Sequence, residues 1–359
     1  MLWLLLREPL DGPGWQRRSL YTHAPNVRAP ILIGHDYQDE QTGPSGWRLW
    51  KRIPDSVPKR LVVSNGPHQV HRFLGPEIDA WFDRWLLGKA SPPVPDRQPR
   101  VRIHFMTRVD PDSGDVLPTP PLRADDFPPA DVQWQPWYLR EGGRLLPDPP
   151  EADEGMATYR VEPDGDGAAP FVEYRLPVRA PLAICGPLCV TFWAELTSLD
   201  TDFFVLLAEE DEQGRLWGLQ RGLLRASHRE LDEAASTYVE TEGERLLTAP
   251  RHRHETARPV TPRTPVRFDI PVFAVGHVFL PGRTLVVRIG APPEGDPIGV
   301  TKHGGASYRY ASVQPACTVG IRLSPEHASR IVLPVLPQLP PLPGEPWEPE
   351  TVWGLKPVP

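Results

Sequence analysis

The sequence has little cysteine, no excess of positive charge and no long apolar run. Its three cysteines, Cys185, Cys189 and Cys317, cannot form a disulfide framework, and none lies in a paired C-x-x-C of a zinc site. No stretch reaches the roughly 20 apolar residues of a membrane span. The short apolar run at the start lacks the basic region and cleavage site of a secretory signal. We therefore expect a protein without a membrane segment and with a cytoplasmic location.

Charge and proline content narrow the classes further. The net charge of -7 argues against nucleic-acid binding, because phosphate recognition needs a basic face. The 48 prolines exclude a mostly helical fold, since each interior proline costs about 3 kcal/mol in a helix. Many short strands joined by Pro- and Gly-containing turns fit this composition better.

The first quarter of the chain has the pattern of an α/β sheet. Apolar runs at residues 29–34 and 60–64 predict two buried parallel strands, and residues 44–53 predict a short helix between them. An amphipathic helix is expected over residues 73–87, where Pro76 is tolerable only in the first turn. Alternating strands and helices of these lengths are typical of α/β folds.

Beyond a Pro-rich stretch at residues 90–95 the pattern changes to many strands. Segments expected to be strands are 101–106, 171–176, 188–196, 203–208, 266–272, 284–289 and 330–335, with one or two helical turns at 223–234. We predict an α/β part at residues 1–92, an all-β sandwich at residues 98–340 and a Pro-rich tail at residues 341–359.

The informative residues follow the two predicted parallel strands. The first runs into Gly34-His-Asp-Tyr-Gln-Asp-Glu-Gln-Thr-Gly43, and the second into Ser64-Asn-Gly-Pro-His68. Chemistry in open α/β sheets lies just past the carboxyl ends of the strands. An acid followed 29 residues later by a histidine has the order of the serine hydrolase triad, in which histidine takes the serine proton and the acid orients it.

Spacing alone leaves alternatives open. Asp36 and Glu40 compete with Asp39 for the acid, and His71 competes with His68 for the base. An Asp after a strand is also a common helix cap, and a His after Gly-Pro is often an ordinary loop residue.

These loops resemble those of the cocaine-esterase-like hydrolases, which are relatives of the Xaa-Pro dipeptidyl-peptidases. In that family a W-x-D-like pattern holds the triad Asp and a G-x-H-like pattern holds the triad His; the matching positions are Asp39 and His68, with Tyr37 where the family often has Trp. Further similar segments are 15–19, 200–203, 222–228, 277–282 and 329–335, the last four in the family's C-terminal jelly roll. The resemblance implies the C-terminal fragment of an α/β-hydrolase domain followed by a jelly-roll β-sandwich, acting on a small ester or peptide without a cofactor.

The nucleophile that the resemblance implies is missing. A G-x-S-x-G elbow should precede the acid, but the only serine before Asp39 is Ser19, which has no strand-elbow-helix pattern. The near match around Ser307 lacks the final Gly and follows His68, so we interpret it as a loop of the β domain. We expect the chain alone to be nearly inactive, since losing the serine costs on the order of 10⁶ in a studied protease. A truncated gene start, a separate chain carrying the serine half, or a degenerate non-enzyme would each explain this.

Other candidates are weaker. His252 and His254 could face a metal from one strand, but a solvated charged loop is the simpler interpretation. The Asp164–Gly167 segment resembles a calcium loop without its downstream glutamate, so a turn is expected and no metal is assigned. The rival to a hydrolase is a non-catalytic jelly-roll binding module with a vestigial hydrolase remnant. Homo-oligomerisation is compatible with either.

Overall fold

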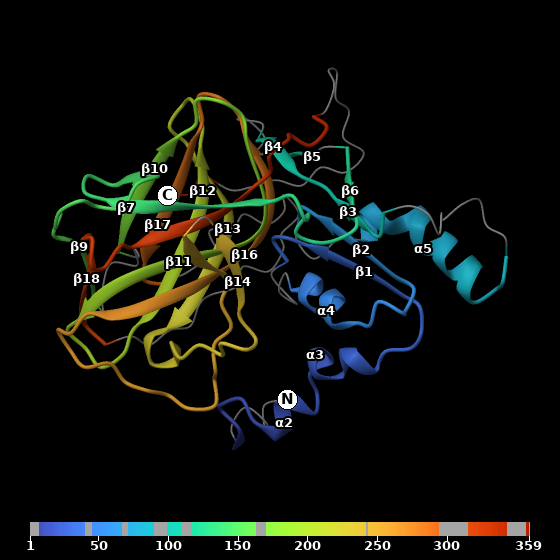
Figure 1. Cartoon of the computed structure of the whole chain (residues 1–359), viewed down its shortest axis with the longest axis horizontal. Helices are drawn as coiled ribbons and strands as arrows, with labels where there is room; N and C mark the ends of the chain where they lie inside the picture. The colour runs from blue at the N-terminus through green and yellow to red at the C-terminus, as the bar shows by residue number, and fades with distance from the viewer. Residues whose placement is uncertain are drawn as a thin grey trace.

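The computed structural model describes residues 7–39, 45–66, 71–89, 99–109, 116–118, 120–162, 170–241, 243–293, 315–342 and 357–358. Within these ranges the chain is rich in strands and has few helices (Figure 1). The helices are α2 (Pro13–Gln16), α3 (Leu20–His23), α4 (Gly46–Arg52) and α5 (His71–Trp85), with 3-10 turns at Ala24–Asn26 and Ala226–His228. None of the described helices is long and apolar enough to cross a membrane.

A small sheet contains the two strands that the sequence predicted as parallel and buried. Its order is β1 (Ile31–Asp36), β2 (Lys59–Ser64), β3 (Val101–Ile103) and β6 (Leu122–Ala124). β1, β2 and β3 run parallel, and β6 runs antiparallel to β3. α4 connects β1 to β2 and packs on both, as a parallel crossover requires. The expected strand-helix-strand arrangement is therefore confirmed here.

Two details of this region differ from expectation. α5 begins at His71, so Pro76 lies in its second turn rather than its first. The strand expected over residues 101–106 is split, with β3 in the small sheet and β4 (Met106–Val109) in the large one. β3 and β6 come after the Pro-rich stretch at residues 90–95 in the chain, yet they belong to the same small sheet as β1 and β2.

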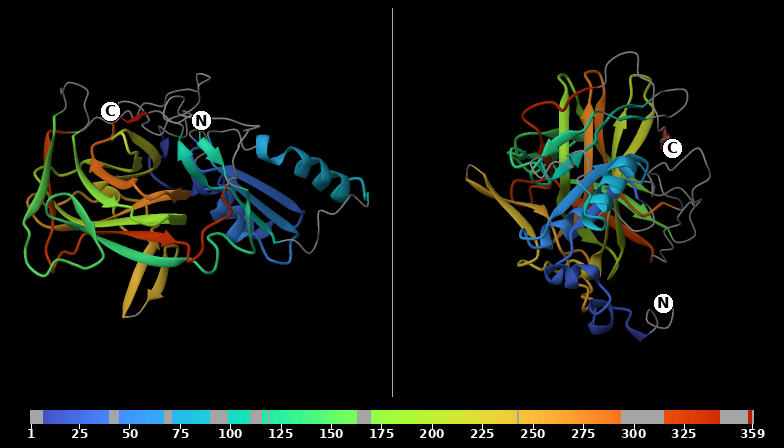
Figure 2. Two further views of the ribbon diagram at one scale, coloured as in Figure 1. Left: turned by 90° about the horizontal axis from the view of Figure 1, so that it is seen from above. Right: turned by 90° about the vertical axis from the view of Figure 1, so that its right-hand side faces the viewer.

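The rest of the described strands form one large sheet and a hairpin. Fourteen strands of the described ranges make the large sheet, in the order β5-β4-β16-β13-β12-β17-β10-β8-β7-β19-β11-β18-β9, with β20 paired to β13. β16 also pairs with β11, so the sheet closes on itself like a barrel. Its strands are β4, β5 (Val116–Pro118), β7 (Gln133–Arg140), β8 (Arg144–Leu146), β9 (Met156–Val161), β10 (Phe171–Pro177), β11 (Leu182–Leu196), β12 (Asp202–Glu210), β13 (Leu216–Arg225), β16 (Val266–Phe279), β17 (Thr284–Gly290), β18 (Cys317–Arg322), β19 (Arg330–Val335) and β20 (Pro357–Val358). The hairpin of β14 (Thr237–Thr241) and β15 (Glu244–Ala249) projects from this body (Figure 2).

β11 is longer than the sequence predicted, and the reason is local. The sequence pattern predicted a strand over residues 188–196, directly after Gly186-Pro187. The strand instead continues through a bulge between Gly186 and Leu188, where Gly186 adopts a φ of 142° that favours glycine. The helical turns expected at 223–234 are reduced to one 3-10 turn, because β13 runs on to Arg225.

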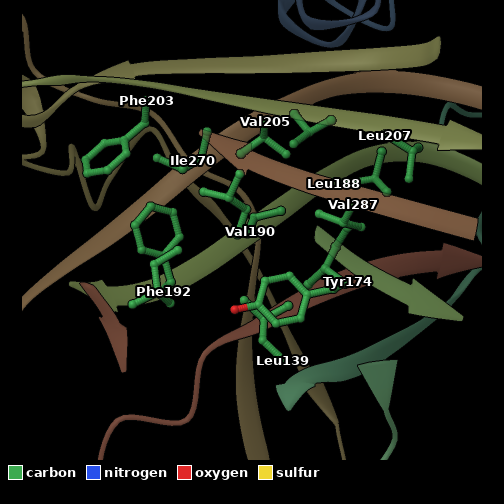
Figure 3. Close-up of a cluster of buried hydrophobic side chains, with 14 of the residues drawn as sticks. Leu139, Tyr174, Leu188, Val190, Phe192, Phe203, Val205, Leu207, Ile270 and Val287 are labelled. Carbon is green, nitrogen blue, oxygen red and sulfur yellow. The ribbon is translucent and has the colours of Figure 1, made fainter. Parts of the chain in front are cut away.

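The main hydrophobic core fills the closed sheet. Figure 3 shows side chains from opposite walls meeting, among them Phe192 of β11, Phe203 of β12 and Val287 of β17, all fully buried. The ring centroids of Phe192 and Phe203 lie 5.1 Å apart in an edge-to-face arrangement. Cys185, Cys189 and Cys317 are buried and free, as expected of small hydrophobic residues. The small sheet lies beside this body, with α5 at its far side (Figures 1 and 2).

Candidate functional site

The carboxyl ends of β1 and β2 lie side by side. The two strands pair in register from Ile31 with Lys59 to Asp36 with Ser64. The Ser64 hydroxyl donates a hydrogen bond to Oδ1 of Asp36, and both side chains are buried. The loops that leave the two strands therefore start from one edge of the small sheet, where an α/β fold positions its reactive groups.

Hydrogen bonds join these two loops directly after the strands end. The Gln38 backbone N–H donates to the Gly66 carbonyl at 3.2 Å, and the Gly66 N–H donates to Oε1 of Gln38 at 2.8 Å. The Tyr37 N–H also donates to the Ser64 carbonyl at 2.8 Å. Gly66 has a φ of 139°, a conformation that side chains rarely adopt, so glycine is required where the second loop turns. We call this arrangement the Gln38–Gly66 clamp.

Strand β13 of the large sheet supports the first loop from the other side. The side-chain amide of Gln38 donates to the Leu219 carbonyl at 3.0 Å. The amide of Gln220 donates to the carbonyls of Tyr37 and Ala274, each at 2.7 Å. Arg221 reaches the Asp39 carbonyl at 3.4 Å. The loop is thus held between the two sheets rather than exposed at the surface.

Asp39 lies at the end of this supported loop and is 6% exposed. Its backbone N–H donates to the Asp36 carbonyl at 3.3 Å. Its charge acts on the buried ring of His35, whose pKa is lowered to about 4 by burial and partly raised again by Asp39. Neither ring nitrogen of His35 has a hydrogen-bond partner in the described part of the chain. Asp39 is therefore a buried carboxylate in a fixed loop beside a neutral imidazole.

Tyr37 anchors the same loop by packing. It is fully buried, and its ring stands edge-on to His35 with the centroids 5.8 Å apart. A Cβ atom at Gly276 of β16 would lie 2.7 Å from the Tyr37 hydroxyl, so the strand approaches the ring closely. Burial raises the pKa of Tyr37 well above its ordinary value, and the hydroxyl stays protonated.

The sequence candidates fare differently. Asp36 and Asp39 are both in the described loop region, Asp36 bonded to Ser64 and Asp39 beyond the Gln38–Gly66 clamp. His68 and Glu40 lie outside the described residues, as does Ser307. His71 begins α5, but its side chain is not described. His68 follows Gly66, the last described residue of this loop, by two positions in the sequence.

The sequence also offered His252, His254 and the Asp164–Gly167 segment as weak metal candidates. His252 is buried, and its Nε2 donates to the Asp269 carbonyl at 2.7 Å, so it is not the solvated loop residue that we expected. No group of His, Cys, Asp or Glu that could hold a metal occurs in the part of the chain that the structure describes. The Asp164–Gly167 segment lies outside that part.

Sequence reasoning missed Gln38, Gln220 and Arg221 as supporting residues. Gln38 and Leu219 are separated by 181 positions, and Tyr37 and Gln220 by 183. No local pattern in either segment signals such a pairing. The one signal in the sequence is the glutamine at position 220, because the amide of a glutamine buried in a strand needs hydrogen-bond partners.

Comparison with known proteins identifies a family and two curated relatives. A family model described as the X-Pro dipeptidyl-peptidase C-terminal non-catalytic domain matches residues 93–294, more than half of the chain. Two proteins named as serine esterases, from Mycobacterium bovis and Mycobacterium tuberculosis, are 28% identical over 239 residues. These matches cover 59% of this chain and 35% of each relative, so the chain spans about a third of their length.

Solved structures share the fold. A CocE/NonD family hydrolase from Staphylococcus aureus superposes with a TM-score of 0.75 and 18% identity, covering 93% of this chain and 58% of that one. An alpha-amino acid ester hydrolase gives 0.67 and 18%, covering 92% and 60%. An aminopeptidase from a marine sediment Thaumarchaeota archaeon gives 0.67 and 16%, covering 92% and 59%.

Proposed function

The chain belongs to the family that carries the X-Pro dipeptidyl-peptidase C-terminal domain, and from this premise we propose that it is the C-terminal part of a serine hydrolase. The resemblance drawn from the sequence is confirmed at the level of the family, and the structural relatives are hydrolases. We further assign the small sheet with α4 and α5 to an α/β-hydrolase domain, and the closed sheet to a jelly roll.

Asp39 and His68 are the proposed acid and base. His68 takes the proton of a serine hydroxyl as it attacks an acyl carbon, and gives that proton to the leaving group. It then takes a proton from the water that attacks the acyl-enzyme, and returns it to the serine as the acid product leaves. Asp39 orients the imidazole and stabilises its protonated form. One observation carries this proposal: the Gln38–Gly66 clamp ties together the two loops that hold these residues.

The proposed reaction is hydrolysis of a small ester or an Xaa-Pro amide through an acyl-enzyme. The serine and the oxyanion donors come from a segment outside this chain, either upstream in a longer reading frame or on a separate polypeptide. The limited share of each relative that the chain spans supports this reading. A homo-oligomer is compatible with the proposal but is not needed for it.

The test is activity of the protein expressed from the reading frame extended upstream of Met1. Hydrolysis of p-nitrophenyl esters and Xaa-Pro p-nitroanilides is measured for the parent protein and for Asp39→Asn and His68→Gln. Each substitution should lower kcat roughly 10⁴-fold with an unchanged fold, because the imidazole loses its role or its orientation. A serine-directed phosphonate should still label the Asp39→Asn protein, only more slowly.

Matched variants separate the candidates. His23→Gln and Asp79→Asn change exposed residues and should leave activity unchanged. Activity that survives His68→Gln but not His71→Gln would move the base to His71. Activity that survives Asp39→Asn but falls with Asp36→Asn or Glu40→Gln would move the acid.

The rival function is a binding module without catalysis. The family description of the matched domain as non-catalytic favours this reading for residues 93–294 taken alone. A glycan array and pull-down with the whole chain would support it if a ligand binds and the extended protein shows no hydrolysis. Hydrolysis that depends on His68 would reject it.

A further inference from the structure

A pocket of about 120 Å³ lies between the start of α4 and the strands β15 and β16. Its walls are apolar where Trp47 and Phe273 face it, and its polar groups are basic. The titratable side chains that line it are Arg48, Arg251, His252 and His254, and no Asp or Glu lines it among the residues described. A small pocket whose charged lining groups are all arginines has the composition of an anion site.

The two arginines of this pocket have no carboxylate partner in the described ranges. The Arg48 guanidinium lies 5.1 Å from the centre of the Trp47 ring, and that of Arg251 lies 5.4 Å from the centre of the Tyr21 ring. Burial, and then the charge of Arg251, lower the pKa of Arg48 to about 10. The half-buried Arg48 and the exposed Arg251 carry like charges that repel each other, and a counter-charge between them would relieve this repulsion.

Two imidazoles lie beside the arginines in the pocket wall. Nδ1 of His254 lies 3.4 Å from Nδ1 of His228, and burial lowers the pKa of both His252 and His254. The nearby carboxylate of Asp269 already accepts hydrogen bonds from Thr191 and Arg267. It is therefore engaged by β11 and β16 and makes no ion pair with the pocket arginines in the described ranges.

We propose that this pocket binds a small oxyanion, held mainly by Arg48 and Arg251. The space suits an ion such as phosphate, sulfate or a short carboxylate, and it is too small for a nucleotide or a peptide. Arg48 belongs to α4 and Arg251 follows β15, so a bound anion ties α4 to the segment that leaves the β14–β15 hairpin. This site needs no serine and is independent of the proposed hydrolase function.

The test is binding of inorganic phosphate to the full 359-residue chain. Calorimetry measures the Kd, and thermal unfolding measures the change in Tm. Phosphate should bind saturably and raise the Tm beyond the effect of chloride at equal ionic strength. Arg48→Gln and Arg251→Gln should each weaken the Kd for phosphate about ten-fold or more, because each removes a charge-assisted hydrogen bond. Sulfate and acetate in parallel distinguish a phosphate-like ligand from a carboxylate.

Arg253→Gln is the matched control, since Arg253 is exposed on the same segment and does not line the pocket. It should leave the Kd for phosphate unchanged. Should Arg48→Gln fail to fold, Arg251→Gln still decides, because Arg251 is exposed at the rim. Absence of saturable binding, an equal effect of chloride, or equal weakening by Arg253→Gln and Arg251→Gln would overturn the proposal.

Discussion

Gln38 and Gly66 exchange two hydrogen bonds across the loops that follow β1 and β2. The Gln38 N–H bonds to the Gly66 carbonyl at 3.2 Å, and the Gly66 N–H bonds to the Gln38 side chain at 2.8 Å. The same Gln38 side chain donates to Leu219 of the large sheet. One buried amide thus joins both loops and both sheets.

Replacing Gln38 should destabilise the protein measurably. Gln38→Ala leaves the Gly66 N–H and the Leu219 carbonyl buried without a partner, at a cost on the order of 2 to 3 kcal/mol in the free energy of unfolding. Urea denaturation monitored by fluorescence measures it. Gln133→Ala, at an exposed position of β7, is the control and should stay within about 0.5 kcal/mol. Equal effects of the two substitutions would contradict the role of the clamp.

A second prediction concerns the buried pair of His277 and Glu209 inside the closed sheet. Nε2 of His277 lies 2.7 Å from Oε2 of Glu209, and both side chains are at most 1% exposed. Arg283 also approaches Glu209 at 3.4 Å. Glu209→Ala removes the shared acceptor and should lower the free energy of unfolding by about 3 to 5 kcal/mol.

The neighbouring residue Glu210 provides the comparison for Glu209. It pairs with Arg175 on the outer face of the same strand, where both side chains are partly exposed. Glu210→Ala should cost no more than about 1 kcal/mol. Guanidinium denaturation measures the free energy of unfolding of both variants. Similar losses for Glu209→Ala and Glu210→Ala would mean that burial of the Glu209–His277 pair does not make the larger contribution to stability predicted for it.

Sequence reasoning succeeded where the information is local. Apolar runs at 29–34 and 60–64, joined by a short predicted helix, suffice to predict the parallel buried strands observed at 31–36 and 59–64, because such strands are covered on both faces. The position after β1 marked Asp36, Asp39 and Glu40 as candidates, and only the family resemblance selected Asp39 among them. The bulge at Gly186 and the contact of Gln220 with Tyr37 could not be predicted, since each depends on a strand that is distant in sequence.

Stability should depend on pH through His35. Its folded pKa is lowered to about 4, below the ordinary value of 6.5, so the unfolded chain binds its proton first as pH falls. The contribution is fully present above pH 6.5 and is lost progressively down to about pH 4, amounting to about 3 kcal/mol at most.

Chemical denaturation at several pH values tests this dependence. His35→Leu should flatten the fall in unfolding free energy between pH 6.5 and about 4, whereas His23→Leu, at an exposed position, should keep the wild-type slope. The difference between the two variants isolates His35 from the carboxylates and from His252 and His254. Parallel curves for all three proteins would show that His35 ionises alike in both states.

The contact between Gly276 and Tyr37 predicts the effect of a single added methyl group. In Gly276→Ala the new Cβ would lie 2.7 Å from the Tyr37 hydroxyl and 2.9 Å from its ring, and Tyr37 is fully buried. The ring cannot move without displacing the loop that carries Gln38 and Asp39. We expect a loss of about 1 to 3 kcal/mol in the free energy of unfolding, as for other overpacked cores.

Gly320→Ala is the control, because the closest atom to its Cβ is the sulfur of the half-exposed Met156 side chain at 3.0 Å, and that flexible chain can shift. An equal loss at both glycines would mean that strand position, rather than the close approach to Tyr37, sets the cost.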